Sequence, residues 1–583
     1  MAKSDGVNSR PKVSPKMKKS LLLASLLLPL AACATAPIAP VAQSAPSASA
    51  GTSADRFRAH VEFLADDALE GREAGTRGFD IAANYVATQM SSLGLAPGDV
   101  DGDYMQDISF ANYTVAKDPA PAFLLDGKRV AQGDGVIVGR LESFAGTRAE
   151  PAPMVFVGSG IHAPQYGIDD YAGVDARGKV VVLYGSPSSN AFEGLPSEVA
   201  SVIGSSVAEM AVEQGAVGII NILPEAVFAR FPWVEFAQTT YRPSLVTRNP
   251  DGSALTETHG MRIAGVVRDQ AAPMLFDKAS VRWQSVRDHI NKGERVAAFD
   301  LGKSIGMERT IVSAPAFSSA NVVGMIEGSD PVLKNEVVML TAHLDHVGMR
   351  GDHGGGGGQF PSKTEGDDDV IYNGALDNAA GIASLLEAAE AFRASGKAPR
   401  RTVMFVALTA EEKGLMGAEW LAQNPAMLGG REIVGLVNLD MPVILSDFDR
   451  VVAFGAQHST MGAAVEDAIA SLGIRRIEDP MPEENFFIRS DHYAFVKAGV
   501  PSVYLDPAAV PSAEGVVEDF LENHYHRPSD DLSLPIDWNA GAKFSLVNYR
   551  IARTIADADE RPRWYTDSYF GTRFAPQAPK AAR

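Results

Sequence analysis

The sequence predicts an α/β protein whose core is a mixed, largely parallel sheet flanked by helices. From about residue 312, apolar strand-like runs such as "EVVMLTAHLD" alternate with long helical patterns such as "DNAAGIASLLEAAEAFRASG". Helices that connect parallel strands produce this alternation. The chain has 583 residues, more than one hydrophobic core usually holds, so we expect at least two domains.

The N-terminal segment resembles the signal peptide of a bacterial lipoprotein. A positive region with Lys16, Lys18 and Lys19 precedes an apolar run that is too short to span a bilayer as a helix. That run ends in "LAAC", and the resemblance implies that residues 1–33 form the signal and that Cys33 carries the lipid. It also implies a membrane-anchored protein of the bacterial cell envelope, at the outer membrane and facing the periplasm.

Alternatives to this N-terminal interpretation stay open. A plain secretory signal cleaved nearby also places the protein outside the cytoplasm. Translation starting at Met17 instead of Met1 would leave a more ordinary signal. Because Cys33 is the only cysteine, internal disulfides and a cysteine-rich zinc finger are excluded.

The segments that follow differ in composition and periodicity. Residues 34–54 are rich in Ala, Pro and Ser and predict a disordered linker. The run "GFDIAANYVATQMSSLG" within residues 55–95 has helical spacing and ends in Gly94. From about residue 120, glycine-bounded runs such as "APMVFVGSGI" and "GKVVVLYG" predict short strands. A final helix is expected near residues 536–557.

The charge balance bears on the kind of partner. Lys and Arg number 52 against 72 Asp and Glu, which gives a net charge of −20. A surface that binds nucleic acid needs a basic face, so this composition argues against a nucleic-acid partner. A soluble acidic surface explains the charge without any partner.

Ionisable side chains gather at the predicted carboxyl ends of three strands. His343 and Asp345 end "VVMLTAHLD", Glu411 and Glu412 end "TVMFVALTAEE", and Asp440 ends "IVGLVNLD". Ligands in open α/β sheets bind at this edge. Two further positions carry similar chemistry: Asp377 in "NGALDNAAG", and Tyr525 with His526 in "ENHYHRPSDD".

Each of these features has an ordinary structural explanation. Asp377 suits a helix N-cap, the Glu411–Glu412 pair suits a solvated strand end, and His343 suits a structural histidine. Together, however, the carboxylates would repel, and a divalent cation is the natural counter-charge. Imidazole and carboxylate ligands without a thiolate favour zinc, with manganese or cobalt also possible. The number of ligands fits two ions that share one carboxylate.

Six motifs, in order, resemble the co-catalytic zinc exopeptidases of the aminopeptidase S and glutamate carboxypeptidase type. They are "AHLDH", "GALDNAAG", "TAEEKGLMGAEW", "NLDM", "RSDHYAF" and "YHRPSD". The resemblance covers about residues 312–560, and residues 55–115 resemble the N-terminal helical part of the same family. It implies a zinc-exopeptidase fold.

The resemblance also implies a role for each site residue. His343 and Asp440 would hold one zinc ion, Glu412 and His526 the other, and Asp377 would bridge the two. In the catalytic set, Glu411 would be the general base, Asp345 would orient His343, and Tyr525 would donate to the oxyanion. The implied reaction is hydrolysis of a peptide bond by a metal-activated water.

The predicted function is a metallo-aminopeptidase acting on short peptides. A carboxypeptidase or dipeptidase of the same fold is the alternative, with Arg489 the candidate for binding a C-terminal carboxylate. A glutaminyl cyclase resembles this family but needs only one zinc ion, against which the full ligand set argues. A non-catalytic cell-surface binding protein is the alternative from another class, and a phosphate-ester hydrolase is conceivable from the chemistry alone.

Two segments depart from the compact members of that family. Residues 119–311 resemble a protease-associated (PA) domain inserted to roof the cleft and restrict substrate size. Trp233 within it is expected in a core, with lining of the cleft as the alternative. The glycine-rich and acidic stretch 351–369 predicts a disordered surface loop, with a flexible lid as the alternative. The expected domain boundaries are 1–33, 34–54, 55–118, 119–311, 312–560 and 561–583.

Overall fold

The computed structural model describes residues 51–583 except for 134, 140–147, 186–191, 257, 259, 314–315 and 350–368. Cys33, the predicted signal and nearly all of the predicted linker and of the 351–369 stretch lie outside the described residues. Among the residues that are described, no helix combines the length and the apolar character needed to cross a bilayer.

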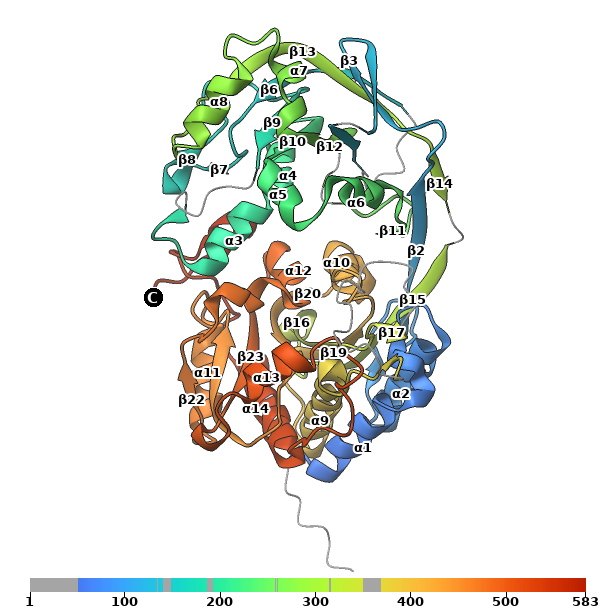
Figure 1. Ribbon diagram of the computed structural model, residues 1–583. Helices are drawn as coiled ribbons and strands as arrows, with labels where there is room; N and C mark the ends of the chain where they lie inside the picture. The colour runs from blue at the N-terminus through green and yellow to red at the C-terminus, as the bar shows by residue number, and fades with distance from the viewer. Residues whose placement is uncertain are drawn as a thin grey trace, which may run out of the picture. The chain divides into compact units, whose positions relative to one another are not determined.

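A large mixed sheet forms the centre of the fold (Figure 1). Its strands run in the spatial order β11-β2-β15-β19-β16-β20-β23-β21-β22, with β1 beside β15 and β14 beside β2. Their bounds are β1 Ala96–Pro97, β2 Met105–Val115, β11 Ser244–Thr247, β14 Ile311–Ser313, β15 Phe317–Ile326, β16 Glu336–His343, β19 Thr402–Leu408, β20 Glu432–Asn438, β21 Phe448–Phe454, β22 Arg475–Ile477 and β23 Ser502–Ala509.

The predicted fold class, a mixed α/β sheet flanked by helices, is confirmed. Strands β19, β16, β20 and β23 pair in parallel, as strand–helix alternation requires. The expectation of a largely parallel sheet holds for this central part and for the outer pair β21–β22. Strands β2, β11 and β15 pair antiparallel, and β23 is antiparallel to β21. These outer pairings join segments that are distant along the chain, such as β11 with β2, and the strand–helix alternation of the central part does not report them.

Helices cover both faces of the large sheet. The alternation of side chains along each strand gives two apolar faces. One face packs against α1 Ala54–Leu64, α2 Arg77–Ser92, α9 Ala380–Ala394, α11 Met461–Ala470 and α14 Trp538–Asp557. The other packs against α10 Met416–Gln423 and α12 His492–Lys497. The remaining helices of this part are α13 Val516–Asn523 and α15 Tyr569–Phe574.

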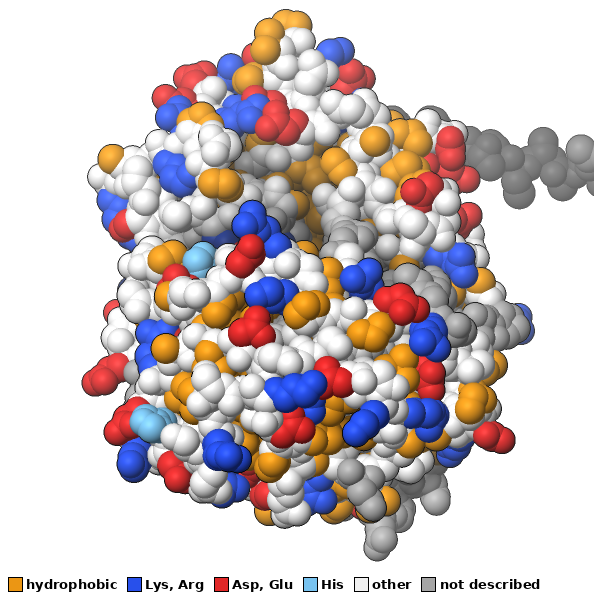
Figure 2. Space-filling model, turned by 90° about the horizontal axis from the view of Figure 1, so that it is seen from above, with side chains coloured by type: hydrophobic (Ala, Val, Ile, Leu, Met, Phe, Trp, Pro, Cys, Tyr) orange, Lys and Arg blue, Asp and Glu red, His pale blue; other side chains and the backbone are white. Residues whose placement is uncertain are grey.

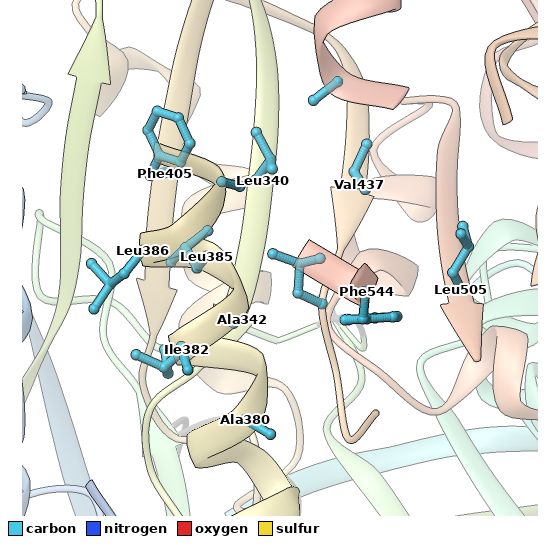
Figure 3. Close-up of a cluster of buried hydrophobic side chains, with 14 of the residues drawn as sticks. Leu340, Ala342, Ala380, Ile382, Leu385, Leu386, Phe405, Val437, Leu505 and Phe544 are labelled. Carbon is cyan, nitrogen blue, oxygen red and sulfur yellow. The ribbon is translucent and has the colours of Figure 1, made fainter. Parts of the chain in front are cut away.

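The main core lies between the parallel strands and helices α9 and α14. Figure 3 shows side chains of α9 and of strands β16 and β19 in contact range, with Phe544 of α14 beside them. Leu340, Leu385 and Phe405 are fully buried here. Burying such side chains contributes about 1.5–3 kcal/mol each. This packing fixes the strands whose ends carry the ionisable residues.

A second sheet is built from the middle of the chain. Its order is β4-β3-β13-β6-β9-β10-β12-β5. The strand bounds are β3 Ala122–Leu125, β4 Lys128–Ala131, β5 Val136–Val138, β6 Arg148–Phe156, β9 Val180–Tyr184, β10 Gly218–Leu223, β12 Ile263–Arg268 and β13 Phe299–Glu308. The helices are α3 Ser197–Ser205, α4 Val207–Glu213, α5 Glu225–Arg230, α6 Trp233–Gln238, α7 Pro273–Phe276 and α8 Trp283–Ile290.

Strand β11 interrupts this middle segment, because it leaves the second sheet and pairs with β2 of the large sheet. Two further short pairs are β7 His162–Ala163 with β8 Ile168–Asp169, and β17 Gly348–Met349 with β18 Ile371–Tyr372.

Trp233 is not in a core, which corrects the sequence expectation. Helix α6 has no buried residue, and the Trp233 ring packs against Phe228 and lies under the guanidinium of Arg268. Its indole N–H donates to the carbonyl of Gly133 at 3.2 Å. The sequence "RFPWVEF" predicted burial from its apolar content, but the helix is too short to have two packed faces.

Candidate metal centre

Three parallel strands bring the predicted ligands to one edge of the large sheet. His343 is the last residue of β16, which lies between β19 and β20. Glu411 and Glu412 follow β19, and Asp440 follows β20. Because these strands are parallel, their carboxyl ends meet at the same edge. The side chains of His343 and Asp440 are buried there.

The other two predicted ligands come from segments distant in sequence. Asp377 lies in the irregular turn Ala375–Ala379 that precedes α9, and His526 follows α13. The Asp377 carboxylate faces both sides of the cluster: Oδ1 lies 3.2 Å from His343 Nε2, and Oδ2 lies 3.1 Å from His526 Nε2.

The cluster is completed on each side by one more carboxylate. Asp440 Oδ1 lies 2.9 Å from His343 Nε2, and Glu412 Oε2 lies 3.1 Å from His526 Nε2. All five predicted ligands therefore form one continuous chain of contacts with Asp377 at its centre. Ligand atoms of His343, Asp377 and Glu412 lie within 4.8 Å of one another.

Asp345 differs from its predicted role. Its backbone carbonyl, and not its side chain, lies 3.0 Å from His343 Nδ1. A carbonyl only accepts, so this contact fixes the proton on Nδ1 and turns Nε2 toward the acids. The Asp345 carboxylate instead accepts from the backbone N–H groups of Glu411 at 3.1 Å and Glu412 at 3.3 Å. It therefore positions the segment that carries the predicted base.

His346 belongs to the centre, although no role was predicted for it. Its buried ring places Nδ1 2.7 Å from Glu412 Oε1 and 3.9 Å from Asp377 Oδ2. Its Nε2 is buried and has no hydrogen-bond partner among the described residues. The signal available was its place in "AHLDH", one residue after Asp345.

Two more buried carboxylates lie at the centre and were not predicted. Asp530 accepts from the backbone N–H groups of Leu376 at 2.9 Å and Asp377 at 3.0 Å, and so holds the turn. Both carboxylate oxygens of Asp491 are buried without a hydrogen-bond partner among the described residues. Asp530 lies in the motif "YHRPSD" and Asp491 in "RSDHYAF". In both motifs the predictions concerned other residues.

The pKa values reflect an excess of buried acid. Burial raises the pKa of Glu411 well above its usual value, and Glu412, Asp491 and Asp440 raise it further. Burial also raises the pKa of Asp345 to about 6. Burial alone would lower the pKa of His343, yet Asp440 and Glu411 raise it well above normal. Each shift has the sign expected where negative charge lacks a counter-charge.

The donor set fits divalent metal ions. Seven carboxylates meet three imidazoles, and the remaining basic groups nearby are already engaged. Lys413 pairs with Glu73 at 2.7 Å, and the guanidinium of Arg72 donates to backbone carbonyls, including that of Leu344 at 3.0 Å. A metal ion would neutralise the surplus and use the imidazole nitrogens and carboxylate oxygens that face one another. The seven acids are Asp345, Asp377, Glu411, Glu412, Asp440, Asp491 and Asp530.

Comparison with known proteins finds a family model that matches this region. Residues 321–552 match the family model of Peptidase family M28. The five predicted ligands and Glu411 all lie inside the matched range. The match indicates a metallopeptidase hydrolase that acts on peptides.

Solved structures of such enzymes are also similar to this chain. An aminopeptidase from Aneurinibacillus sp. strain AM-1 is 16% identical, with a TM-score of 0.40, over 88% of this chain and 95% of its own. BSAP, a zinc aminopeptidase from Bacillus subtilis, is 17% identical, with a TM-score of 0.40, over 88% and 97%. A Peptidase M28 precursor from Shewanella amazonensis SB2B is 16% identical, with a TM-score of 0.36, over 88% and 99%.

Proposed function

We propose that this chain is a zinc-dependent aminopeptidase that removes N-terminal residues from short peptides. One observation carries the proposal: within the region that matches Peptidase family M28, the carboxylate of Asp377 faces His343 with one oxygen and His526 with the other. A carboxylate placed between two ligand pairs suits a bridge between two metal ions.

In this proposal the ligands divide into two sets. His343 and Asp440 would hold one zinc ion, Glu412 and His526 would hold the second, and Asp377 would serve both. When bound, the ions polarise the carbonyl of the scissile bond and lower the pKa of water. Other divalent ions are possible at the same ligands.

Glu411 acts as the proton carrier in this proposal. Burial and neighbouring acids raise its pKa, the direction needed by a group that takes a proton and returns it near neutral pH. The carboxylate of Asp345 accepts from the backbone N–H of Glu411 at 3.1 Å. This hydrogen bond fixes the backbone position of Glu411. Glu411 takes the proton of the attacking water and then delivers it to the leaving amine.

Tyr525 acts as the donor to the developing oxyanion. Its ring stacks on His526 with 3.9 Å between centroids. Burial raises the pKa of Tyr525 well above its usual value, and the acids Asp377, Glu412 and Glu411 raise it further. The phenol therefore stays protonated, which a hydrogen-bond donor requires.

Arg489, the candidate for the carboxypeptidase alternative, contacts Glu484. Its guanidinium lies 3.0 Å from Glu484 Oε2 and donates to the Glu484 carbonyl at 3.3 Å. A residue that recognises a substrate carboxylate needs free donors. Both contacts use Nη1, so Nε and Nη2 keep the carboxypeptidase as the alternative that the substrate test below separates from the aminopeptidase.

The N-terminal features extend the proposal to the site of action. The signal-like segment and Cys33 support an envelope lipoprotein, and the β-rich middle segment is proposed to act as a PA domain. Cells fed radiolabelled palmitate should label the wild-type protein and not Cys33→Ser. Labelling of that variant would rule out the anchor.

The proposed function is tested with one short peptide in two forms, free and N-acetylated. We expect cleavage of the free form only, loss of activity with a chelator, and recovery with zinc. Cleavage of the acetylated form from its C-terminal end would overturn the aminopeptidase assignment in favour of a carboxypeptidase. Cleavage of neither form by protein with bound zinc would contradict a peptidase function.

A further inference from the structure

A cavity of about 310 Å³ lies at the same sheet edge as the metal centre. Strands β21 and β23 form one wall, and the N-terminal part of α13 forms another. A cavity of this size holds one side chain. Its lining includes Val452, Ile477, Met481, Phe486, Asp506 and Val517.

Strand register places this cavity beside the proposed metal ligands. Strand β23 pairs in parallel with β20, with Tyr504 opposite Asn438. Continuing that register by two residues brings Asp506 opposite Asp440. Helix α13, which lines the other side, runs directly into Tyr525 and His526. The cavity therefore lies between the strand next to a metal ligand and the helix that leads to two site residues.

The cavity combines apolar walls with unbalanced negative charge. Asp479 and Asp506 are part of its lining, and the exposed Glu514 and Glu518 lie at its edge. Arg450 is the basic residue among the described residues of the lining, and it is already engaged. Its guanidinium donates to the Ala509 carbonyl and lies 3.3 Å from Asp449.

Asp506 is the acid in this lining that has an enclosed carboxylate oxygen, Oδ1, without a hydrogen-bond partner among the described residues. Burial, followed by the charges of Asp479 and Asp440, raises its pKa to about 7. The neighbouring Asp479 is partly satisfied, because it accepts from the Met481 backbone N–H at 2.8 Å. An enclosed carboxylate without a partner is costly unless a cation pairs with it.

We propose that this cavity receives the side chain of the substrate residue on the amino side of the scissile bond, and that Asp506 selects Lys or Arg there. The aliphatic part of such a side chain would lie along Val452, Ile477 and Phe486, with its charged end at Asp506. This assignment rests on the aminopeptidase function proposed above. A cavity for uncharged side chains, with Asp506 protonated, is the competing outcome.

The first test compares fluorogenic amides of Arg, Lys, Leu and Glu with the zinc-loaded enzyme. We expect the largest kcat/KM for Arg or Lys. The variant Asp506→Asn keeps the size of the side chain and removes its charge, so the ratio of Arg to Leu kcat/KM should fall at least about tenfold. Asp506→Leu should prefer the leucine amide.

Asp519→Asn is the matched control. Like Asp506→Asn, it replaces one carboxylate by an amide, but on α13, at an exposed position outside the cavity lining. We expect its Arg to Leu ratio to match the wild type. A fall equal to that of Asp506→Asn would show a long-range charge effect and overturn the assignment of Asp506.

A second measurement separates this inference from the proposed function. Calorimetry would measure arginine amide and leucine amide binding to zinc-loaded Glu411→Gln, with and without Asp506→Asn. We expect the arginine amide to bind at least about tenfold more tightly, and only with Asp506 present. Equal binding of the two amides overturns the inference, even if the wild type cleaves leucine amide. Asp506-dependent arginine binding without cleavage by the wild type supports the pocket and contradicts the aminopeptidase.

Discussion

Single side-chain atoms determine the arrangement of the metal centre. Asp377 gives one carboxylate oxygen to each half of the cluster, and His343 is turned by one backbone carbonyl. His346 adds a contact of 2.7 Å to Glu412. Because separate contacts hold the individual ligands, a substitution at a residue that is not a ligand should change catalysis while metal binding is kept.

Glu411→Gln tests the division between catalysis and metal binding. Glu411 is not among the five proposed ligands, so both metal ions should remain. Glutamine cannot carry the proton, and kcat should fall by roughly 10²–10⁴. Metal content by mass spectrometry and kcat with a free peptide measure the two effects. Glu390→Gln, on α9 away from the centre, is the control, and near-normal turnover of Glu411→Gln would remove Glu411 from its role.

Asp506→Asn should also change the pH dependence of stability. Its pKa of about 7 in the folded state exceeds the ordinary value of 3.8. Between these values the unfolded chain releases the proton while the folded protein keeps it, so the wild type loses stability as pH rises from about 4 to 7. The variant should therefore gain about 4 kcal/mol relative to the wild type between pH 4 and pH 8. Denaturant unfolding at both pH values measures this, and a constant difference would contradict it.

At the scale of elements, one turn carries the central ligand. The turn Ala375–Ala379 precedes α9, whose apolar residues are packed in the main core. Asp530 closes the turn from another part of the chain by accepting two backbone N–H groups, and its own backbone carbonyl accepts from Ala375 at 3.0 Å. The position of Asp377 thus depends on α9 and on the loop that follows His526.

Asp530→Asn should weaken metal binding without touching a ligand. The amide keeps one acceptor oxygen but points N–H donors at a backbone N–H, which loosens the turn. Loss of such a supporting contact typically lowers metal affinity 10–100-fold, and excess zinc should restore activity. Asp531→Asn is the control, since within the described part of the chain that carboxylate accepts from the Ser533 backbone N–H and not from the turn. Unchanged zinc affinity of Asp530→Asn would exclude this supporting role.

At the scale of the whole molecule, the centre joins segments from residue 343 to residue 526. On the face drawn in Figure 2, basic and acidic side chains lie interspersed among the described residues. The metal centre has no such balance, because its acids outnumber its imidazoles. Metal ions would therefore stabilise the fold as well as support catalysis.

Chelation should lower both activity and thermal stability. A ligand that binds only the folded state stabilises by about 2.7 kcal/mol at one hundred times its Kd, so removing zinc should lower Tm by several degrees. Stoichiometric back-titration should restore Tm and activity together, with an endpoint at two ions per chain. An unchanged Tm after complete metal removal would show that the acids are balanced in another way.

The sequence by itself determined the α/β class, and it predicted which residues carry the chemistry. Apolar strands ending in His343, Glu412 and Asp440 indicated a shared edge, and the family match contains that region. These features depend on local periodicity and on the position of parallel strand ends, both of which a sequence displays directly.

Only the tertiary structure decided the antiparallel outer strands, the role of the Asp345 carboxylate, and the places of His346, Asp530 and Asp506. These features depend on pairings between distant segments, such as β11 with β2 and Asp530 with the turn before α9. A side chain's contacts, burial and pKa arise from what packs against it, and residues far along the chain supply that packing.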